Sequence, residues 1–117
     1  MDRPETEAWF AAQPTPFRIL VLLEVMHWLT IALRDVATRD GLDARARWEA
    51  AYLVSECNHR LVGYITAVMT GQPHYPDDVI IGILFDYLDH PNLAPYTHGV
   101  WDSAVENATR FGAHLRQ

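Results

Sequence analysis

Residues 15–41 read TPFRILVLLEVMHWLTIALRDVATRDG, and this stretch decides the fold class. Thr15-Pro16 is a helix start, because threonine caps a helix and proline suits its first turn. Asp40-Gly41 is a glycine stop. The few polar side chains between these signals recur at helical spacing and form one narrow stripe, made of Glu24, His27, Arg34 and Thr38. The stretch therefore predicts a long helix over residues 16–39, buried on most of its sides.

A stretch this apolar also has to be tested as a membrane span. Its most hydrophobic part, residues 17–36, carries several charged or ionisable side chains: Arg18, Glu24, His27, Arg34 and Asp35. A carboxylate near the bilayer centre costs about 2.5 kcal/mol or more. The uninterrupted apolar runs are also far shorter than the roughly 20 residues that a span needs. We therefore expect a core helix of a soluble protein and no membrane partner.

A second helix is expected over residues 43–70, capped by Asp43 and interrupted by Gly71-Gln72-Pro73. One of its faces has apolar residues alternately four and three apart, the pattern of a packed helix pair: Ala50, Val54, Cys57, Leu61, Tyr64 and Val68. The opposite side is partly apolar as well, at Trp48, Tyr52 and Val62. Since one core cannot use both sides of a helix, this predicts a contact between two copies of the chain.

Two shorter helices complete the expected fold. Pro76 followed by two aspartates opens a helix over residues 77–90, although the β-branched residues inside it leave a strand as the minority alternative. Pro95 precedes an amphipathic helix over residues 96–115. The chain is thus expected to be all-α, a small antiparallel bundle of about four helices.

The same reading makes residues 1–117 a single domain. It treats residues 1–14 as a loosely held N-terminal arm whose Trp9 and Phe10 dock on the body of the protein. The polar, acidic N-terminus has no signal-peptide character, and the lone Cys57 cannot form an internal disulfide. We therefore expect the reducing environment of the cytoplasm.

Charge narrows the range of partners. The chain has nine arginines, no lysine and fifteen acids, a net charge of −6. From Gly71 onward the acids outnumber the arginines, so no basic face for nucleic-acid phosphates is visible. The acidity is best explained by solubility, with a basic partner as the alternative. We expect a protein partner or a second copy of the chain.

Two Glu-x-x-His motifs are the main chemical signal, Glu24 with His27 and Glu56 with His59. Spacing of three places both side chains on one helical face. Ferritin-like bundles hold iron or manganese with this pairing, and the resemblance is limited to these four residues. If the first two helices turn back at Gly41, Glu24 lies level with His59 and His27 with Glu56.

Four interpretations of this set stay open. The side chains could form buried hydrogen bonds between the helices, which we favour, or a solvated stripe. They could instead bind Fe, Mn or Zn, at a mononuclear site or at one shared across a dimer. Acid–base catalysis is the least favoured interpretation.

Other catalytic patterns are missing from the sequence. It has no phosphate-binding loop, dinucleotide glycine pattern or nucleophile elbow, and Cys57 lies on the packing seam. Tyr75 and Tyr96, in two proline-rich loops, could anchor a partner. The expected function is therefore an acidic, soluble, homodimeric protein-interaction module without enzymatic activity. The alternative is a metal-binding bundle with oxidoreductase or hydrolase activity.

Overall fold

The computed structural model describes residues 2–117, and helices are the only regular secondary structure in that range. Met1, part of the expected arm, lies outside the described residues. The elements in chain order are α1 (Arg3–Ala11), α2 (Thr15–Thr38), α3 (Ala44–Thr70), α4 (Asp77–Leu88), the 3₁₀ turn η1 (Ala94–Tyr96), α5 (Val100–Gly112) and the 3₁₀ turn η2 (Ala113–Arg116). The all-α fold is confirmed, with five α-helices in place of about four.

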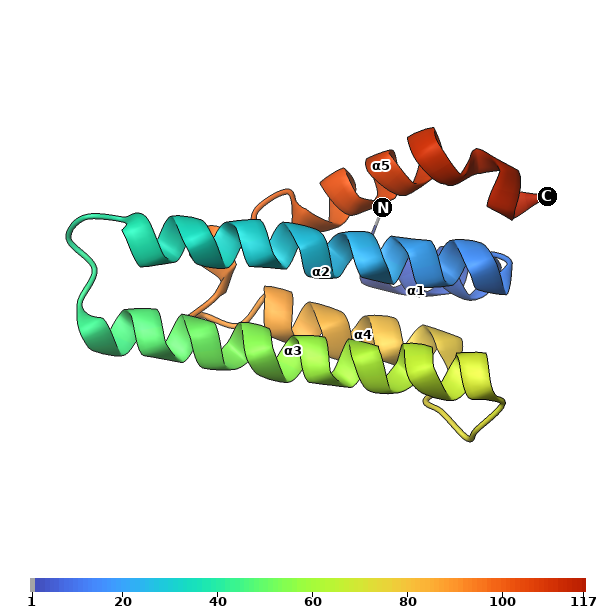
Figure 1. Cartoon of the computed structure of the whole chain (residues 1–117), viewed down its shortest axis with the longest axis horizontal. Coiled ribbons are helices and arrows are strands. Elements are labelled where there is room, and N and C mark those ends of the chain that lie inside the picture. The colour runs from blue at the N-terminus through green and yellow to red at the C-terminus, as the bar shows by residue number, and fades with distance from the viewer. Residues whose placement is uncertain (1) are drawn as a thin grey trace.

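The two long helices lie side by side and run in opposite directions (Figure 1). α3 begins where the sequence predicts, because Asp43 accepts a hydrogen bond of 2.7 Å from the backbone N–H of Ala46. It ends at Gly71, whose φ of +69° closes the helix in the left-handed conformation that glycine adopts most easily. These end signals fix the length of α3. The Thr15 cap and Gly41 stop predicted for α2 are wrong, because α2 begins at Thr15 after Pro14 without a side-chain cap hydrogen bond and ends at Thr38 with Arg39 as its C-cap.

α2 contacts more elements than any other helix among the described residues, touching α3, α5, η1 and η2. Its buried side chains are Phe17, Val21, Leu22, Val25, Leu29, Ala32 and Val36. By length and composition alone α2 could also cross a membrane, and 33% of its most apolar 18-residue window is buried inside the protein. Its inward face forms the middle of the hydrophobic core.

The N-terminal segment differs from the expectation, because it is a helix and not a loosely held arm. Asp2 caps α1 by accepting a hydrogen bond of 2.9 Å from the N–H of Glu5, and Pro4 occupies the first turn. α1 packs against α4, where the guanidinium of Arg3 donates to the carbonyl oxygen of Gly82 and, at 2.7 Å, to Asp86. Phe10 is fully buried and Trp9 half-buried.

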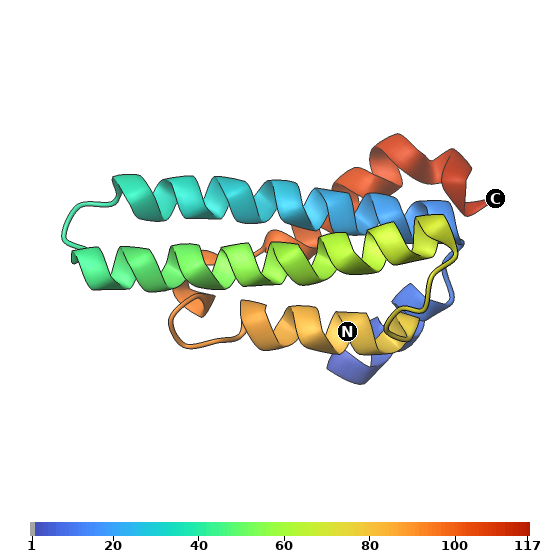
Figure 2. The same cartoon turned by 60° about the horizontal axis from the view of Figure 1, so that its bottom comes forward.

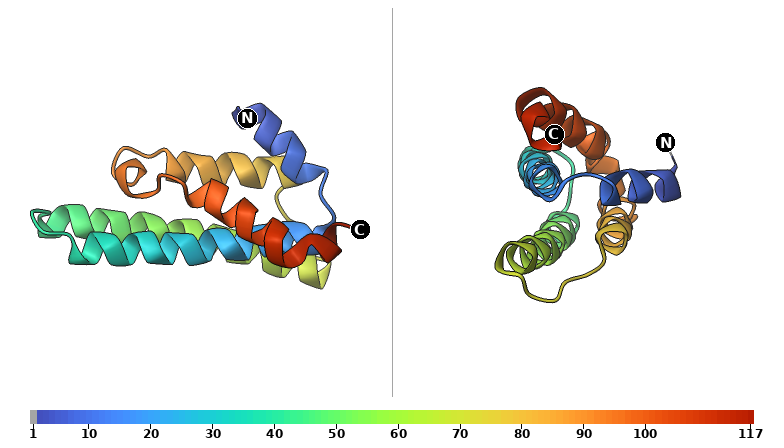
Figure 3. Two further views of the ribbon diagram at one scale, coloured as in Figure 1. Left: turned by 90° about the horizontal axis from the view of Figure 1, so that it is seen from above. Right: turned by 90° about the vertical axis from the view of Figure 1, so that its right-hand side faces the viewer.

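The second half of the chain packs against one side of the α2–α3 hairpin. α4 packs against α3 and α1, and α5 packs against α2 (Figures 2 and 3). Residues 79–85 are helical, so the strand alternative is wrong. α4 ends two residues earlier than predicted, and α5 begins only after Gly99, whose φ of +80° turns the chain into the helix. The outer side of α3 has no helix against it among residues 2–117.

Candidate functional site

The first Glu-x-x-His motif lies on α2 and does not face α3 with its carboxylate. Glu24 is half-buried, and its Oε2 accepts a hydrogen bond of 3.4 Å from Nδ2 of Asn107 on α5. His27 is exposed, with its ring edge-on to Trp28 at a centroid distance of 5.6 Å. Glu24 therefore belongs to the contact between α2 and α5, whereas His27 is exposed to solvent.

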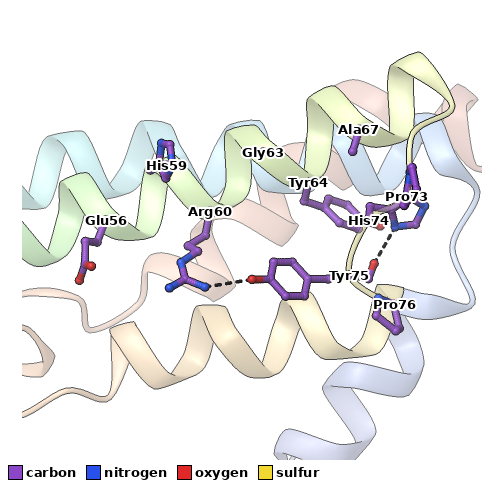
Figure 4. Close-up of a pocket in the computed structure, with 10 residues that line it drawn as sticks. All are labelled: Glu56, His59, Arg60, Gly63, Tyr64, Ala67, Pro73, His74, Tyr75 and Pro76. Atoms are coloured by element: carbon purple, nitrogen blue, oxygen red, sulfur yellow. Dashed lines mark hydrogen bonds between the residues drawn. The ribbon is translucent and has the colours of Figure 1, made fainter.

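The second motif lies in the middle of α3. Glu56 is half-buried and His59 is exposed, and Figure 4 shows the two side chains leaving the helix in different directions. Neither of the expected cross-helix pairs, Glu24 with His59 or His27 with Glu56, forms an ion pair within residues 2–117. The same range contains no group of three or more His, Cys, Asp or Glu side chains that could hold a metal ion.

A cavity that is open to solvent lies between α3 and the loop that connects it to α4. Its volume is about 730 Å³, within the usual range for small-molecule sites. Figure 4 shows the lining side chains, which are Glu56, His59, Arg60, Gly63, Tyr64, Ala67, Pro73, His74, Tyr75 and Pro76. Three of the side chains singled out in the sequence (Glu56, His59 and Tyr75) thus line this cavity without contacting one another, together with others that were not singled out.

The wall formed by the loop is held in place by a chain of polar contacts. The hydroxyl of Tyr64 donates a hydrogen bond of 2.5 Å to Asp77, the first residue of α4, and Asp77 also pairs with Arg18 of α2 at 3.4 Å. Nδ1 of His74 donates to the carbonyl oxygen of Tyr75 at 2.6 Å, and the His74 ring lies edge-on to Tyr64. The loop is therefore tied to both α2 and α3.

Arg60 carries the permanent positive charge of the cavity. Its Nη1 donates a hydrogen bond of 3.0 Å to the hydroxyl of Tyr75, a neutral partner, although Glu56 lies one helical turn away (Figure 4). A guanidinium has five N–H donors, so this contact leaves several of them available to a ligand.

Burial changes the acidity of three groups near the cavity. It raises the pKa of Tyr64 to about 12, and the hydrogen bond to Asp77 adds to this increase. Burial also raises the pKa of Tyr87 on α4, with a further increase from the negative charge of Glu56. The buried thiol of Cys57 has its pKa raised to about 12. These phenols and this thiol are neutral near pH 7, which argues against Cys57 as a nucleophile.

The two loop tyrosines proposed as anchors differ in their surroundings. Tyr75 is exposed at the rim of the cavity. Tyr96 is half-buried in η1, and the guanidinium of Arg39 lies over its ring, 5.2 Å from the centroid. Tyr75 is therefore the more accessible of the two.

A second surface begins beside the cavity and follows the outer side of α3. We call it the α3 outer face, and it consists of Trp48, Tyr52, Ser55, His59, Val62, Thr66 and Met69, all of them exposed. Trp48 is 65% exposed and Met69 70% exposed. The rings of Trp48 and Tyr52 stack at 5.4 Å with an interplanar angle of 11°. The face alternates spacings of four and three residues, which is the repeat of a helix that packs against another helix.

Sequence reasoning did not find Arg60, Tyr64 and His74 as cavity residues. The available signal was the loop Pro73-His74-Tyr75-Pro76, in which two prolines rigidly bracket two polar aromatic residues. Spacing along the chain does not reveal that this loop folds back onto α3.

Comparisons with known proteins give no match to this chain among family models, curated proteins or solved structures.

Proposed function

We propose that this protein is a non-enzymatic interaction module that pairs with a second copy of itself through the α3 outer face. The supporting observation is that seven exposed residues follow the helix-pairing repeat along α3, and four of them are large and apolar. Scattered single apolar residues are normal on a protein surface. Several large apolar side chains along one uncovered side of a helix are typical of an interface.

The chemistry of this row favours a second copy over a charged partner. None of its seven side chains is an Asp, Glu or Arg, although 21% of the chain is charged. A face kept in water would normally carry such residues. The row is also apolar at both ends, with Ser55 and His59 in its middle.

Self-complementarity follows from the positions of these residues. His59 lies eleven residues after Trp48 and ten residues before Met69, so it is close to the midpoint of the row. Two copies laid antiparallel with full overlap would bring Trp48 of each copy against Met69 of the other. Sulfur–aromatic contact of this kind is favourable, and a two-fold interface uses the same patch on both partners.

The remaining parts of the proposal concern the scaffold and its setting. We take α2, α3, α4 and α5 as an antiparallel bundle that holds the α3 outer face rigid. The net charge of −6 suits a cytoplasmic protein that binds neither nucleic acid nor anionic membranes. Tyr75, which is exposed at the cavity rim, is the further anchor that we propose for a partner.

Sedimentation velocity at about 5–50 μM protein tests the pairing. We expect a dimer for the wild type and a monomer for Tyr52→Glu and Val62→Glu, because each would bury an unpaired carboxylate. Phe111→Glu is the matched control, since Phe111 is 69% exposed on α5, away from the α3 outer face. A monomeric wild type over this range, or equal dissociation of the control variant, would refute the pairing.

Metal binding is a second candidate, supported by the exposure of both imidazoles. His27 and His59 are accessible on α2 and α3, so they could be joined by ligands of a second copy. Imidazole with the carboxylates Glu24 and Glu56 suits Fe, Mn or Zn. Its support is weaker, because Glu24 is already bonded to Asn107.

A further inference from the structure

We infer that the cavity between α3 and residues 73–76 binds a small, flat carboxylate monoanion, with its charged end at Arg60. This goes beyond pairing through the α3 outer face, because it assigns a ligand class to a neighbouring site that shares only His59 with that face. Three observations carry it: the guanidinium of Arg60, the apolar walls and the distribution of charge in the cavity.

Arg60 is a guanidinium that the protein holds in position without neutralising it. Its hydrogen bond to the Tyr75 hydroxyl fixes one N–H of the fork at 3.0 Å. Within residues 2–117 four arginines form ion pairs with carboxylates (Arg3, Arg18, Arg45 and Arg110), and Arg60 is not among them. Guanidinium and carboxylate match as planar, two-pronged groups, so a ligand carboxylate would fit the N–H donors that remain.

The walls of the cavity suit a flat apolar body. Pro73, Tyr75 and Pro76 form one side, and Gly63 and Ala67 leave room on α3 (Figure 4). A Cβ added at Gly63 would meet nothing within 4 Å. The loop side is tied down by the Tyr64–Asp77 hydrogen bond, so little ordering is needed when a ligand enters.

The charges in the cavity favour one negative charge over several. Arg60 offers hydrogen-bond donors and a permanent positive charge, whereas Glu56 is the one carboxylate among the lining residues. Figure 4 places Glu56 at the end of the cavity farthest from the loop. A polyphosphate long enough to span the cavity would meet that carboxylate, and like charges repel. A single carboxylate held at Arg60, with its ring toward Tyr75, would not.

Isothermal titration calorimetry with 2-naphthoate, 2-naphthamide and inorganic phosphate tests the assignment. Naphthamide keeps the ring without the charge, and phosphate keeps the charge without the ring. For naphthoate we expect a dissociation constant at or below about 1 mM, as its size allows. Naphthamide and phosphate should each bind at least about tenfold more weakly.

Arg60→Gln should weaken naphthoate binding by a factor of about ten or more. Arg45→Gln is its matched control, because Arg45 lies on the same helix, exposed and paired with Glu49 outside the cavity. Equal binding by both variants, equal binding of naphthamide, or no naphthoate binding up to about 10 mM would overturn the inference. The titration is repeated with Tyr52→Glu, so that loss of pairing and loss of the cavity ligand are separate results.

Discussion

The hydroxyl of Tyr64 and the carboxylate of Asp77 lie 2.5 Å apart, which joins the middle of the fold to the start of α4. Tyr64 is almost fully buried, and Asp77 is also the partner of Arg18 on α2. This contact therefore connects α2, α3 and α4 at one point and fixes the loop wall of the cavity.

Tyr64→Phe should lower the free energy of unfolding by about 1–2 kcal/mol, because it removes a hydrogen bond to a charged group. The melting temperature should fall by about 4–8 °C, measured by circular dichroism. Tyr52→Phe is the matched control, since Tyr52 is an exposed tyrosine of the same helix. If the two variants melt together, the Tyr64–Asp77 contact does not stabilise the fold.

The same phenol predicts a loss of stability in alkali. Folding raises the pKa of Tyr64 from 10.0 to about 12, so the folded state favours the neutral phenol. Its contribution is complete below pH 10 and is lost as the pH rises toward 12, because the unfolded chain then releases the proton more readily. Urea unfolding at a series of pH values should give a shallower alkaline decline for Tyr64→Phe than for the wild type. An equal alkaline decline of stability in both proteins would show that folding does not raise the pKa of Tyr64.

Cys57 should be unreactive in the native protein. It is buried on α3, and burial raises the pKa of its thiol from 9.0 to about 12. The thiolate is the reactive form, so it is scarce at pH 8 even before access is considered. Iodoacetamide labelling followed by mass spectrometry should modify the unfolded chain at least about a hundredfold faster than the native one. Rapid labelling of the native protein would contradict the buried position.

Salt should strengthen the proposed pairing. Each copy has a net charge of −6, whereas the α3 outer face contains no Asp, Glu or Arg. Raising the ionic strength screens the repulsion between copies and leaves the apolar contact intact. The dimer dissociation constant, measured by sedimentation, should therefore decrease between about 0.05 and 0.5 M NaCl. An increase would indicate that ion pairs hold the copies together.

Elemental analysis of protein purified without chelator tests the metal-binding candidate. A site shared by two copies predicts about one Fe, Mn or Zn per two chains, and His59→Ala should remove it. Less than about a tenth of an equivalent after supplementation would contradict it. Because His59 is exposed, the same substitution should change stability by less than about 0.5 kcal/mol.

The ends of α3 were predictable because their signals are local, whereas α2 begins without the expected threonine cap and ends before the expected glycine. Asp43 and Gly71 act on backbone groups within a few residues of themselves, so the predicted helix over 43–70 agrees closely with α3. The short α1 carries a cap of the same kind at Asp2, but a nine-residue helix is marginal without packing. α1 is held against α4, where Arg3 contacts Asp86. A local sequence pattern does not predict a contact between residues so far apart in the chain.

The candidate site was less predictable, for a geometric reason. The level of two residues in a hairpin follows from their numbers, but the rotation of each helix about its axis does not. Glu24 lies level with α3 residues yet faces α5, because α2 is packed between the two helices. The cavity also depends on the Tyr64–Asp77 hydrogen bond, which cannot be predicted from the spacing of these residues in the sequence.

The docking of α1 on α4 has a consequence for the newly made chain. α1 leaves the ribosome before α4, and Arg3 finds its acceptor Gly82 only after a further 79 residues have been added. The α2–α3 hairpin can form in the meantime, because its two helices are consecutive in the sequence. The burial of Phe10, whose ring lies 6.5 Å from that of Trp101, must therefore await α5 as well as α4. α1 is thus synthesised before the elements that it packs against, and until they follow, its aromatic side chains are exposed surfaces on which a chaperone could act.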